Sequence, residues 1–261
     1  MYSGEIITSC ANPLVKILAK LGDAKYRREE GLFLCEGKKL AEEALQRADV
    51  KYLLVSDSQK DSYSDLCDLA DSVGAKVDYL AEAPFAKIST EKAPQGIIAV
   101  CAIPDSDKSL ADSKHIFMCD GVRDPGNLGT IFRTAGALGF DTVVISDCAD
   151  VYNPKTVRAS MGGIFRLNIV CSVDAVQTVR ALRDGGRRVF AAALKNDSKI
   201  LGNYDLKESD VFIVGNEGHG LSDEVISECT DTVLIEMSSE TESLNVSAAS
   251  VIIMWEISKT F

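Results

Sequence analysis

The chain has 261 residues and is acidic, with 39 aspartates and glutamates against 28 lysines and arginines and a net charge of −11. A negative surface repels phosphate, so this composition excludes non-specific nucleic-acid binding by the whole surface and confines any RNA contact to a local patch. Hydrophobic residues make up 46% of the chain, which is enough to form a core. The sequence shows neither an apolar run of roughly 20 residues nor a basic segment followed by an apolar leader, so we expect a cytoplasmic protein that makes no membrane contact.

The first 103 residues alternate helical and strand patterns and predict a small α/β domain. The expected helices and strands are a helix near 12–21, a strand at 31–37, a helix at 38–48, a strand at 51–57, a helix at 63–73, a strand at 76–81, a short helix after Pro84 and a strand at 96–103. The polar segment PDSDKSLADSK, residues 104–114, lacks an apolar period and is predicted as a linker.

The second domain, predicted at 115–261, contains near-continuous apolar runs, which are typical of strands covered on both faces. These runs are residues 115–120, 141–146, 167–173, 187–194, 210–216 and 231–237. Helical stretches separate them, so we predict an α/β fold with a mostly parallel sheet. Ligands bind beyond the carboxyl ends of such strands. The loops after 115–120, 210–216 and 231–237 are therefore expected to converge on one site.

The first loop continues into DPGNLGTIFRTAGALGF, residues 124–140, which is neither a P-loop nor a dinucleotide fingerprint. Asn127 can cap a helix that begins at Leu128, or it can serve a site. Ile131, Ala135 and Leu138 form one apolar stripe, and Arg133 points about 200° away from the first of them. Arg133 is thus either a solvated surface residue or a guanidinium directed at a phosphate or a reacting oxygen.

The second and third loops carry further candidates. Glu217 lies among glycines, either as an exposed turn residue or as a carboxylate in a ligand site, with Arg133 as one possible partner. Ser243 can cap the last helix, whereas Asn245 is expected one or two positions inside it. Trp255 and its apolar neighbours on that helix suit either a dimer interface or intramolecular packing. The eight cysteines form no C-x-x-C pair and only two histidines are present, so we expect no metal site.

Three segments taken in order resemble a known family. They are NLGTIFRTA, FIVGNEGHGL and IEMSSETESLNVSAA, and they closely resemble the three motifs of the SpoU/TrmH family of RNA ribose 2′-O-methyltransferases, in the SPOUT superfamily. The similarity spans about residues 115–258 and includes YNPKTVRASMGGIFRL. In addition, YRREEGLFLCEGKKLAEEAL resembles the N-terminal substrate-binding domain of members that modify ribosomal RNA, a domain similar to a small RNA-binding ribosomal protein.

This resemblance implies a deep trefoil knot in the second domain, a homodimer formed through that domain, and S-adenosylmethionine as the cofactor. The positions that match the family's active site are Arg133, Asn127, Glu217, Ser243 and Asn245. The positions that match its cofactor site are Gly215, Asn216, Glu217, Gly218, Ile235, Met237 and Leu244. Where most members have proline and glycine in the third motif, this chain has Glu236 and Ser239, so the loop geometry there is expected to differ.

The resemblance therefore implies methylation of a ribose 2′-hydroxyl in RNA, with 23S ribosomal RNA as the favoured target. Transfer RNA as the target, or a non-catalytic RNA-binding factor in ribosome assembly, are the alternatives. Residues 1–103 would bind the RNA substrate, and we expect contacts from Lys16, Lys25, Arg27, Arg28 and Lys38. The alternative is that these cations only form a solvated face, because lysines and arginines are ordinarily exposed. Lys155, Arg158 and Arg166 form a second basic group. Arg133 would bind phosphate and the developing alkoxide, because an arginine side chain stays protonated and is a poor base.

Overall fold

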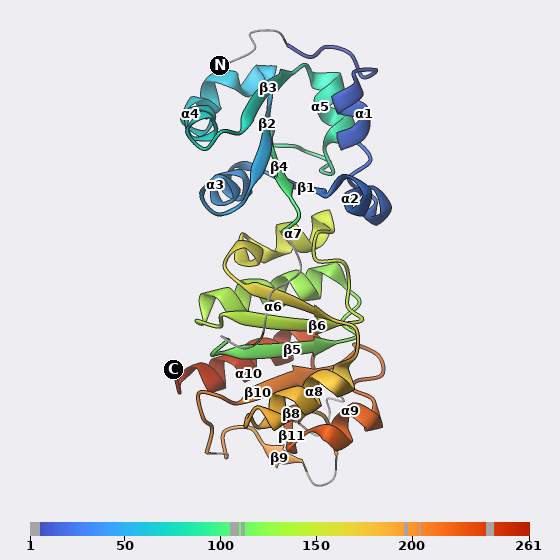
Figure 1. Ribbon diagram of the computed structural model, residues 1–261, viewed down its shortest axis with the longest axis vertical. Coiled ribbons are helices and arrows are strands. Elements are labelled where there is room, and N and C mark those ends of the chain that lie inside the picture. Colours follow the sequence, from blue (N-terminus) through green and yellow to red (C-terminus); the bar gives the residue numbers. More distant parts are fainter. Residues whose placement is uncertain (1–5, 105–109, 111–112, 196–197, 204, 239–242) are drawn as a thin grey trace. The chain divides into compact units, whose positions relative to one another are not determined.

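The structure is a computed structural model that describes residues 6–104, 110, 113–195, 198–203, 205–238 and 243–261. Its chain forms two compact units (Figure 1). The first contains residues 1–104 and 150–165, and the second contains 105–149 and 166–261. Most of the predicted linker at 104–114 and the unusual Ser239 lie outside the described residues. The segment 150–165, which we expected in the second domain, groups with the first unit, where Phe33 packs against Tyr152 with ring centroids 4.6 Å apart.

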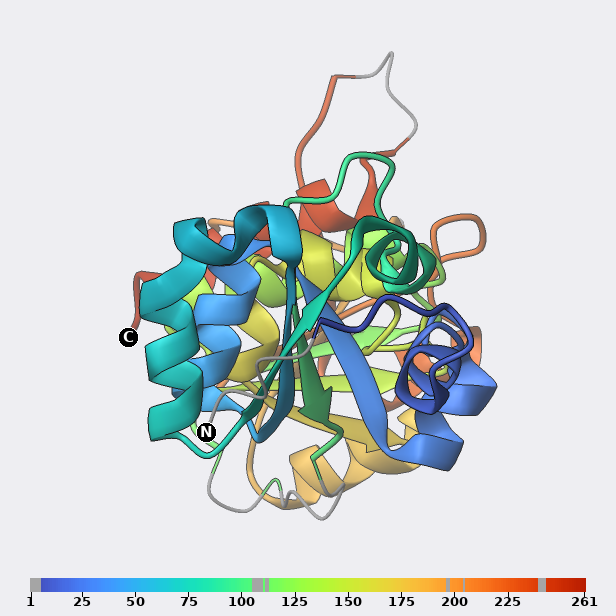
Figure 2. The same ribbon diagram turned by 90° about the horizontal axis from the view of Figure 1, so that it is seen from above.

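The first unit is built on a four-stranded sheet in the order β1-β4-β2-β3. Strand β4 runs antiparallel to β1 and β2, and β3 runs parallel to β2. Helices α3 and α4 cover one face and α1 and α5 the other (Figures 1 and 2). The strands are β1 (Leu32–Glu36), β2 (Val50–Ser56), β3 (Lys76–Leu80) and β4 (Ile97–Ala102); the helices are α1 (Pro13–Leu18), α2 (Ala24–Glu30), α3 (Lys38–Arg47), the 3-10 helix η1 (Asp57–Tyr63), α4 (Ser64–Ser72), α5 (Glu82–Ile88), α7 (Pro154–Ser160) and the 3-10 helix η2 (Gly163–Phe165).

Two details of the first unit differ from the sequence prediction. The single helix expected near 12–21 ends at Leu18, and α2 follows, because Asp23 caps a new helix by accepting from the backbone N–H of Lys25 at 2.8 Å. Helix α5 begins at Glu82, ahead of Pro84. A proline is tolerated in the first turn of a helix, where its missing N–H has no intrahelical partner to lose.

The second unit contains a seven-stranded sheet in the order β7-β6-β5-β10-β8-β11-β9, and every pairing within it is parallel. This confirms the predicted mostly parallel sheet. The strands are β5 (Ile116–Asp120), β6 (Thr142–Ser146), β7 (Asn168–Ser172), β8 (Val189–Ala192), β9 (Lys199–Ile200), β10 (Val211–Val214) and β11 (Asp231–Leu234); the helices are α6 (Pro125–Ala137), α8 (Ala175–Asp184), α9 (Asp223–Glu228) and α10 (Val246–Ser258). The short β9 has no counterpart among the predicted strands.

Helices cover this sheet on both faces. Val179 of α8 and Val225 of α9 belong to one buried cluster with Met118 and Ile213 of the sheet, and Figure 1 shows α8 and α9 in front of the strands and α10 behind them. Helix α10 packs against α6 and β10. None of the helices in the described ranges has both the length and the apolarity needed to cross a bilayer. The carboxyl ends of β5, β8, β10 and β11 meet at one edge, so the loops that follow them lie together.

Candidate active site

The loop after β10 is organised by Asn216. Its backbone exchanges two hydrogen bonds with Gly220, of 3.1 and 2.9 Å, and its side-chain oxygen accepts from the backbone N–H of Gly218 at 2.8 Å. Its Nδ2 donates to the carbonyl oxygen of Gly121 at 2.8 Å. Asn216 therefore closes its own loop and also joins it to the loop after β5.

Gly215, at the start of the same loop, is buried and closely surrounded by backbone. A Cβ at this position would overlap the carbonyl carbon of Gly220 and lie 2.5 Å from the amide nitrogen of Leu221. The atoms it would meet are backbone atoms, which cannot rotate away as a side chain does. The tight return of the chain from Gly220 past Gly215 thus depends on the absence of a side chain.

The Glu217 carboxylate is held by the first loop. It accepts from the backbone N–H groups of Arg123 and Asp124, both at 3.1 Å, and from Nδ2 of Asn127 at 3.0 Å. Partial burial raises the pKa of Glu217, but the combined effect of these hydrogen bonds is larger, so the pKa is lowered from its ordinary value. Glu217 is therefore a carboxylate at neutral pH. Its partners are N–H groups at the start of α6 and not the Arg133 side chain, which was one possible partner.

Of the two roles that the sequence left open for Asn127, the structure excludes the helix cap. Helix α6 begins at Pro125, and its cap is Asp124, whose side chain accepts from the backbone N–H of Asn127 at 2.9 Å. The prediction of a helix beginning at Leu128 is wrong because Asp-Pro is a strong start signal, with proline favoured at the first helical position. The Asn127 side chain is consequently available to bind Glu217 through Nδ2.

Asn245 completes a hydrogen-bonded chain across the three loops. Its Nδ2 donates to Oδ1 of Asn127 at 3.1 Å, and its own Oδ1 accepts from the backbone N–H of Ser247 at 2.9 Å. Asn245 is the N-cap of α10, so the expectation that it lies inside that helix is wrong. Each amide orientation is fixed by its partners. We call Glu217, Asn127 and Asn245 the amide chain.

A cavity of about 430 Å³ lies beside the amide chain. Its walls include residues at and after the ends of β8, β10 and β11 together with residues of α10. All seven positions that match the family's cofactor site line it, as does Ser243, namely Gly215, Asn216, Glu217, Gly218, Ile235, Met237, Ser243 and Leu244. Sequence reasoning missed the wall at the end of β8, which is Ala192, Ala193, Leu194 and Lys195. The signal for that wall is the strand order, because β8 lies between β10 and β11.

Arg133 does not join the other predicted catalytic residues within one chain. It lies six residues after Asn127 on α6, which places it about 120° away round the helix axis. Its side chain is exposed, it does not line the cavity, and no hydrogen bond or ion pair joins it to another residue in the described ranges. The possible contact between Arg133 and Glu217 is therefore not formed within the described residues.

The predicted RNA-binding residues of the first unit divide into two groups. Lys16, Lys25, Arg28 and Lys38 are exposed. Arg27 is only 2% exposed, and its guanidinium donates to the carbonyl oxygen of Leu21 at 2.7 Å and to the Asp150 carboxylate at 2.6 Å. An RNA contact at Arg27 is inconsistent with this burial. Arg27 instead joins α2 to the start of segment 150–165 within the first unit.

The two roles of Asn245 can be separated by substitution. Asn245→Ser keeps an oxygen that can cap α10 but removes the amide donor to Asn127, whereas Asn245→Ala removes both. We expect the free energy of unfolding of Asn245→Ala to be about 1 kcal/mol lower than that of Asn245→Ser. Both variants should lose activity to the same degree, because both lack the amide donor to Asn127. Chemical denaturation and an activity assay measure the two effects. Normal activity in Asn245→Ser would contradict a role for the amide chain.

Comparisons with known proteins place the chain in a family. Residues 114–255 match the model of the SpoU rRNA Methylase family, which is more than half of the chain. The chain belongs to the SpoU rRNA methylase family. Residues 12–99 also match the MRM3-like substrate binding domain, so a second family model covers most of the first unit.

Relatives of this SpoU family member are similar over nearly the full length. The 23S rRNA (guanosine(2553)-2′-O)-methyltransferase RlmP of Bacillus subtilis is 35% identical over 96% of this chain and 98% of its own. The crystal structure of an AdoMet-bound rRNA methyltransferase from Sinorhizobium meliloti has a TM-score of 0.86 at 30% identity, covering 98% of this chain and 97% of that one. A putative RNA methyltransferase of the TrmH family from Porphyromonas gingivalis has a TM-score of 0.82 at 33% identity, covering 95% and 97%.

Proposed function

We propose that this protein transfers a methyl group from S-adenosylmethionine to a ribose 2′-hydroxyl in ribosomal RNA. The observation that carries the proposal is the amide chain, which joins the three loops by hydrogen bonds and whose Glu217 lines the cavity. The RlmP relative, which modifies 23S rRNA by name, supports the substrate class, and the AdoMet-bound neighbour supports the cofactor.

The cavity suits the proposed cofactor. Its volume of about 430 Å³ is in the range of small-molecule sites, which combine apolar walls with a few polar groups. Ile235 and Leu244 give apolar contact, the glycine-rich loop gives backbone groups, and the ionised Glu217 favours a cationic ligand. Bound there, S-adenosylmethionine would supply a methyl group on a positively charged sulfur.

The side chains of the amide chain position the ribose. Each asparagine Nδ2 has two N–H groups, and the amide chain uses one, so the second can donate to the sugar. Fixed orientation of the hydroxyl lowers the barrier by supplying the entropy of alignment in advance. We propose that Arg133 binds the neighbouring phosphate and the developing alkoxide, and that the hydroxyl proton passes to that phosphate.

A homodimer would bring Arg133 to the site. Helix α10 is apolar on all sides, a pattern typical of buried helices, yet Val251, Ile252 and Trp255 are 38%, 40% and 58% exposed. Such a face marks an interaction surface. We propose that a second copy covers it, and that Arg133 of the second copy reaches the amide chain.

Mixing two inactive variants tests this dimer. Arg133→Ala and Asn127→Ala homodimers are allowed to exchange subunits. If Arg133 acts across the interface, each mixed dimer contains one intact site, and activity should recover to about a quarter of that of the unaltered protein, because half of the dimers are mixed. No recovery, despite mixed dimers seen by native mass spectrometry, would contradict the proposal. The unmixed variants are the control.

We also propose, from the family, that the second unit contains a trefoil knot and that the protein acts in the cytoplasm. The position of β10 between β5 and β8, and the packing of α10 on α6, are compatible with such a knot. Limited proteolysis followed by refolding tests for threading, because a threaded chain refolds more slowly than one whose C-terminal segment is cut free. Equal refolding rates would contradict the knot.

Mapping ribose methylation across total RNA, with and without the gene, tests the function itself. We expect one 2′-O-methyl group to disappear from 23S ribosomal RNA. A loss confined to transfer RNA would support that alternative substrate. Unchanged methylation, together with no S-adenosylmethionine binding by calorimetry, would support a non-catalytic assembly factor.

A further inference from the structure

Three segments of the first unit meet around the start of α3. The backbone N–H of Gly37 donates to the carbonyl oxygen of Ile97 at 3.0 Å, and that of Lys38 donates to the Gln95 side chain at 2.9 Å. The start of α3 therefore lies against the loop 89–96. Helix α7 reaches the same loop through the ion pair between Arg158 and Glu91.

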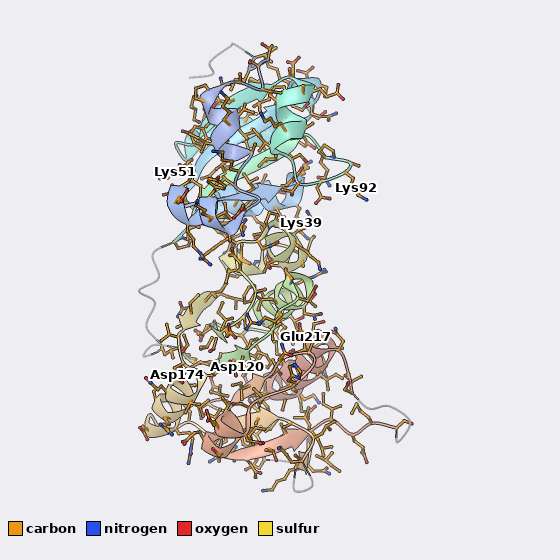
Figure 3. All side chains as sticks on the ribbon, turned by 90° about the vertical axis from the view of Figure 1, so that its right-hand side faces the viewer. Lys39, Lys51, Lys92, Asp120, Asp174 and Glu217 are labelled. Carbon is orange, nitrogen blue, oxygen red and sulfur yellow. The ribbon has the colours of Figure 1, made fainter. Side chains whose placement is uncertain are left out.

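These segments present exposed cations together. We call Lys38, Lys39, Lys92 and Arg158 the α3 surface, and all four side chains are exposed. Figure 3 shows Lys39 and Lys92 projecting on the same side of the first unit, with Lys51 on the opposite side. Lys51 is paired with Asp49 at 2.6 Å, so it is a natural reference for a lysine outside this surface.

The acidic side chains near the α3 surface are largely engaged. Glu36 accepts from the backbone N–H of Thr90 at 2.8 Å and from its hydroxyl at 3.0 Å. Glu91 is paired with Arg158. Glu42, on the next turn of α3, is exposed. Glu43, also on α3, is paired with Arg47. The four cations of the α3 surface therefore outnumber Glu36, Glu42 and Glu91, whereas the whole chain has a net charge of −11.

The position of two of these lysines is costly for the fold alone. Lys38 and Lys39 occupy the first turn of α3, which contains no acidic residue and whose N-cap residue, Gly37, has no side chain to cap it. The N-terminal end of a helix carries partial positive charge, so cations there are unfavourable. A bound anion would offset that repulsion, which gives a reason for the two lysines beyond folding.

We propose that the α3 surface binds the phosphate backbone of the substrate RNA, an inference that rests on the proposed function. Arg158 belongs to α7, which lies in the sequence between β6 and β7 and within the stretch that matches the methylase family. The methylase stretch of the chain thus contributes a cation to the surface of the substrate-binding unit. Such contacts are independent of base sequence and strengthen binding as salt is lowered.

The test measures binding of an unmodified 23S ribosomal RNA transcript without cofactor, from about 50 to about 200 mM salt. The variants are Lys39→Gln combined with Lys92→Gln, and separately Arg158→Gln; Lys51→Gln is the matched control. Each lost phosphate contact should lower the slope of log affinity against log salt by about 0.7 to 0.9. The double variant should therefore lose about twice that slope, and the control should lose none. Replacing both lysines by arginine should retain the slope.

The outcomes separate this proposal from the proposed function. A double variant with the affinity and slope of the unaltered protein overturns the α3 surface, as does an equal loss in Lys51→Gln. Loss of slope only on replacing Lys16 and Lys25 overturns it in favour of the α1–α2 region. Calorimetric binding of S-adenosylmethionine should be unchanged in every variant. Failure of the unaltered protein to methylate the transcript would count against the proposed function, not against this surface.

Discussion

Arg133→Ala is expected to lower methyl transfer at least about a hundredfold, the size of effect seen when a single charge-stabilising donor is removed from an active site. The planar guanidinium suits a phosphate and an adjacent developing alkoxide, and no neutral side chain replaces it. Its removal should not harm the fold, because the Arg133 side chain is exposed on α6 and forms no hydrogen bond or ion pair with another described residue. Cofactor binding should remain measurable, since Arg133 does not line the cavity.

Turnover with a labelled methyl donor and calorimetry with S-adenosylmethionine measure the two halves of this prediction. Arg133→Lys keeps the charge but loses the paired donors, so it should recover only part of the rate. Arg180→Ala is the matched control, because this arginine of the same unit is 57% exposed and paired with Glu228, and surface ion pairs contribute little to stability. Near-normal turnover in Arg133→Ala would refute the role.

Gly215→Ala is expected to disrupt the cofactor cavity through backbone overlap. The added methyl would collide with the carbonyl group of Gly220 and with the amide of Leu221, neither of which is at the end of a flexible side chain. Overpacking of this kind costs about 3 kcal/mol. The loop from Gly215 to Leu221 would have to open, which would also displace Glu217 from the N–H groups that bind it. Cofactor binding should be lost together with this stability.

Gly218→Ala is the matched control for stability. A Cβ there would meet only the Asn216 side-chain oxygen, at 3.5 Å, which is an ordinary contact. Its free energy of unfolding should change by less than about 0.5 kcal/mol. Chemical denaturation of both variants, with calorimetry for the cofactor, checks the pair. Equal stability of the two variants would show that the loop does not need glycine at 215.

The sequence predicted those parts of the fold that local hydrophobic patterns determine, namely the strands and the type of sheet. The apolar runs located six of the seven strands of the second unit, and their continuity indicated a parallel sheet. Two-residue β9 is too short to give a pattern. The pairing of Arg27 with Asp150, residues 123 apart in sequence, could not be foreseen from local charge, and it removes one arginine from the exposed set.

For the site, the sequence indicated the residue types but not their geometry. The cap role considered for Asn127 and the position of Asn245 inside a helix were both wrong, because propensity alone does not fix a helix boundary to within one residue. The structure shifts both boundaries and thereby lets the two amides meet. Arg133 is separated from Glu217 because it lies on a different side of α6 from Asn127, and because Glu217 is bound by the N–H groups at the start of that helix. The sequence of one motif does not reveal this arrangement. The wall after β8 depends on strand order alone.

The central claim is that the three loops form one site for ribose methylation, and the most direct test is methyl transfer to unmodified 23S ribosomal RNA by the purified protein. A 2′-O-methyl group blocks alkaline cleavage at the modified nucleotide, so the product can be located along the RNA. We predict a single protected ribose that forms only when S-adenosylmethionine is present. The Asn127→Ala variant should not form it. Binding of the cofactor without any protected ribose, in either ribosomal or transfer RNA, would contradict the account.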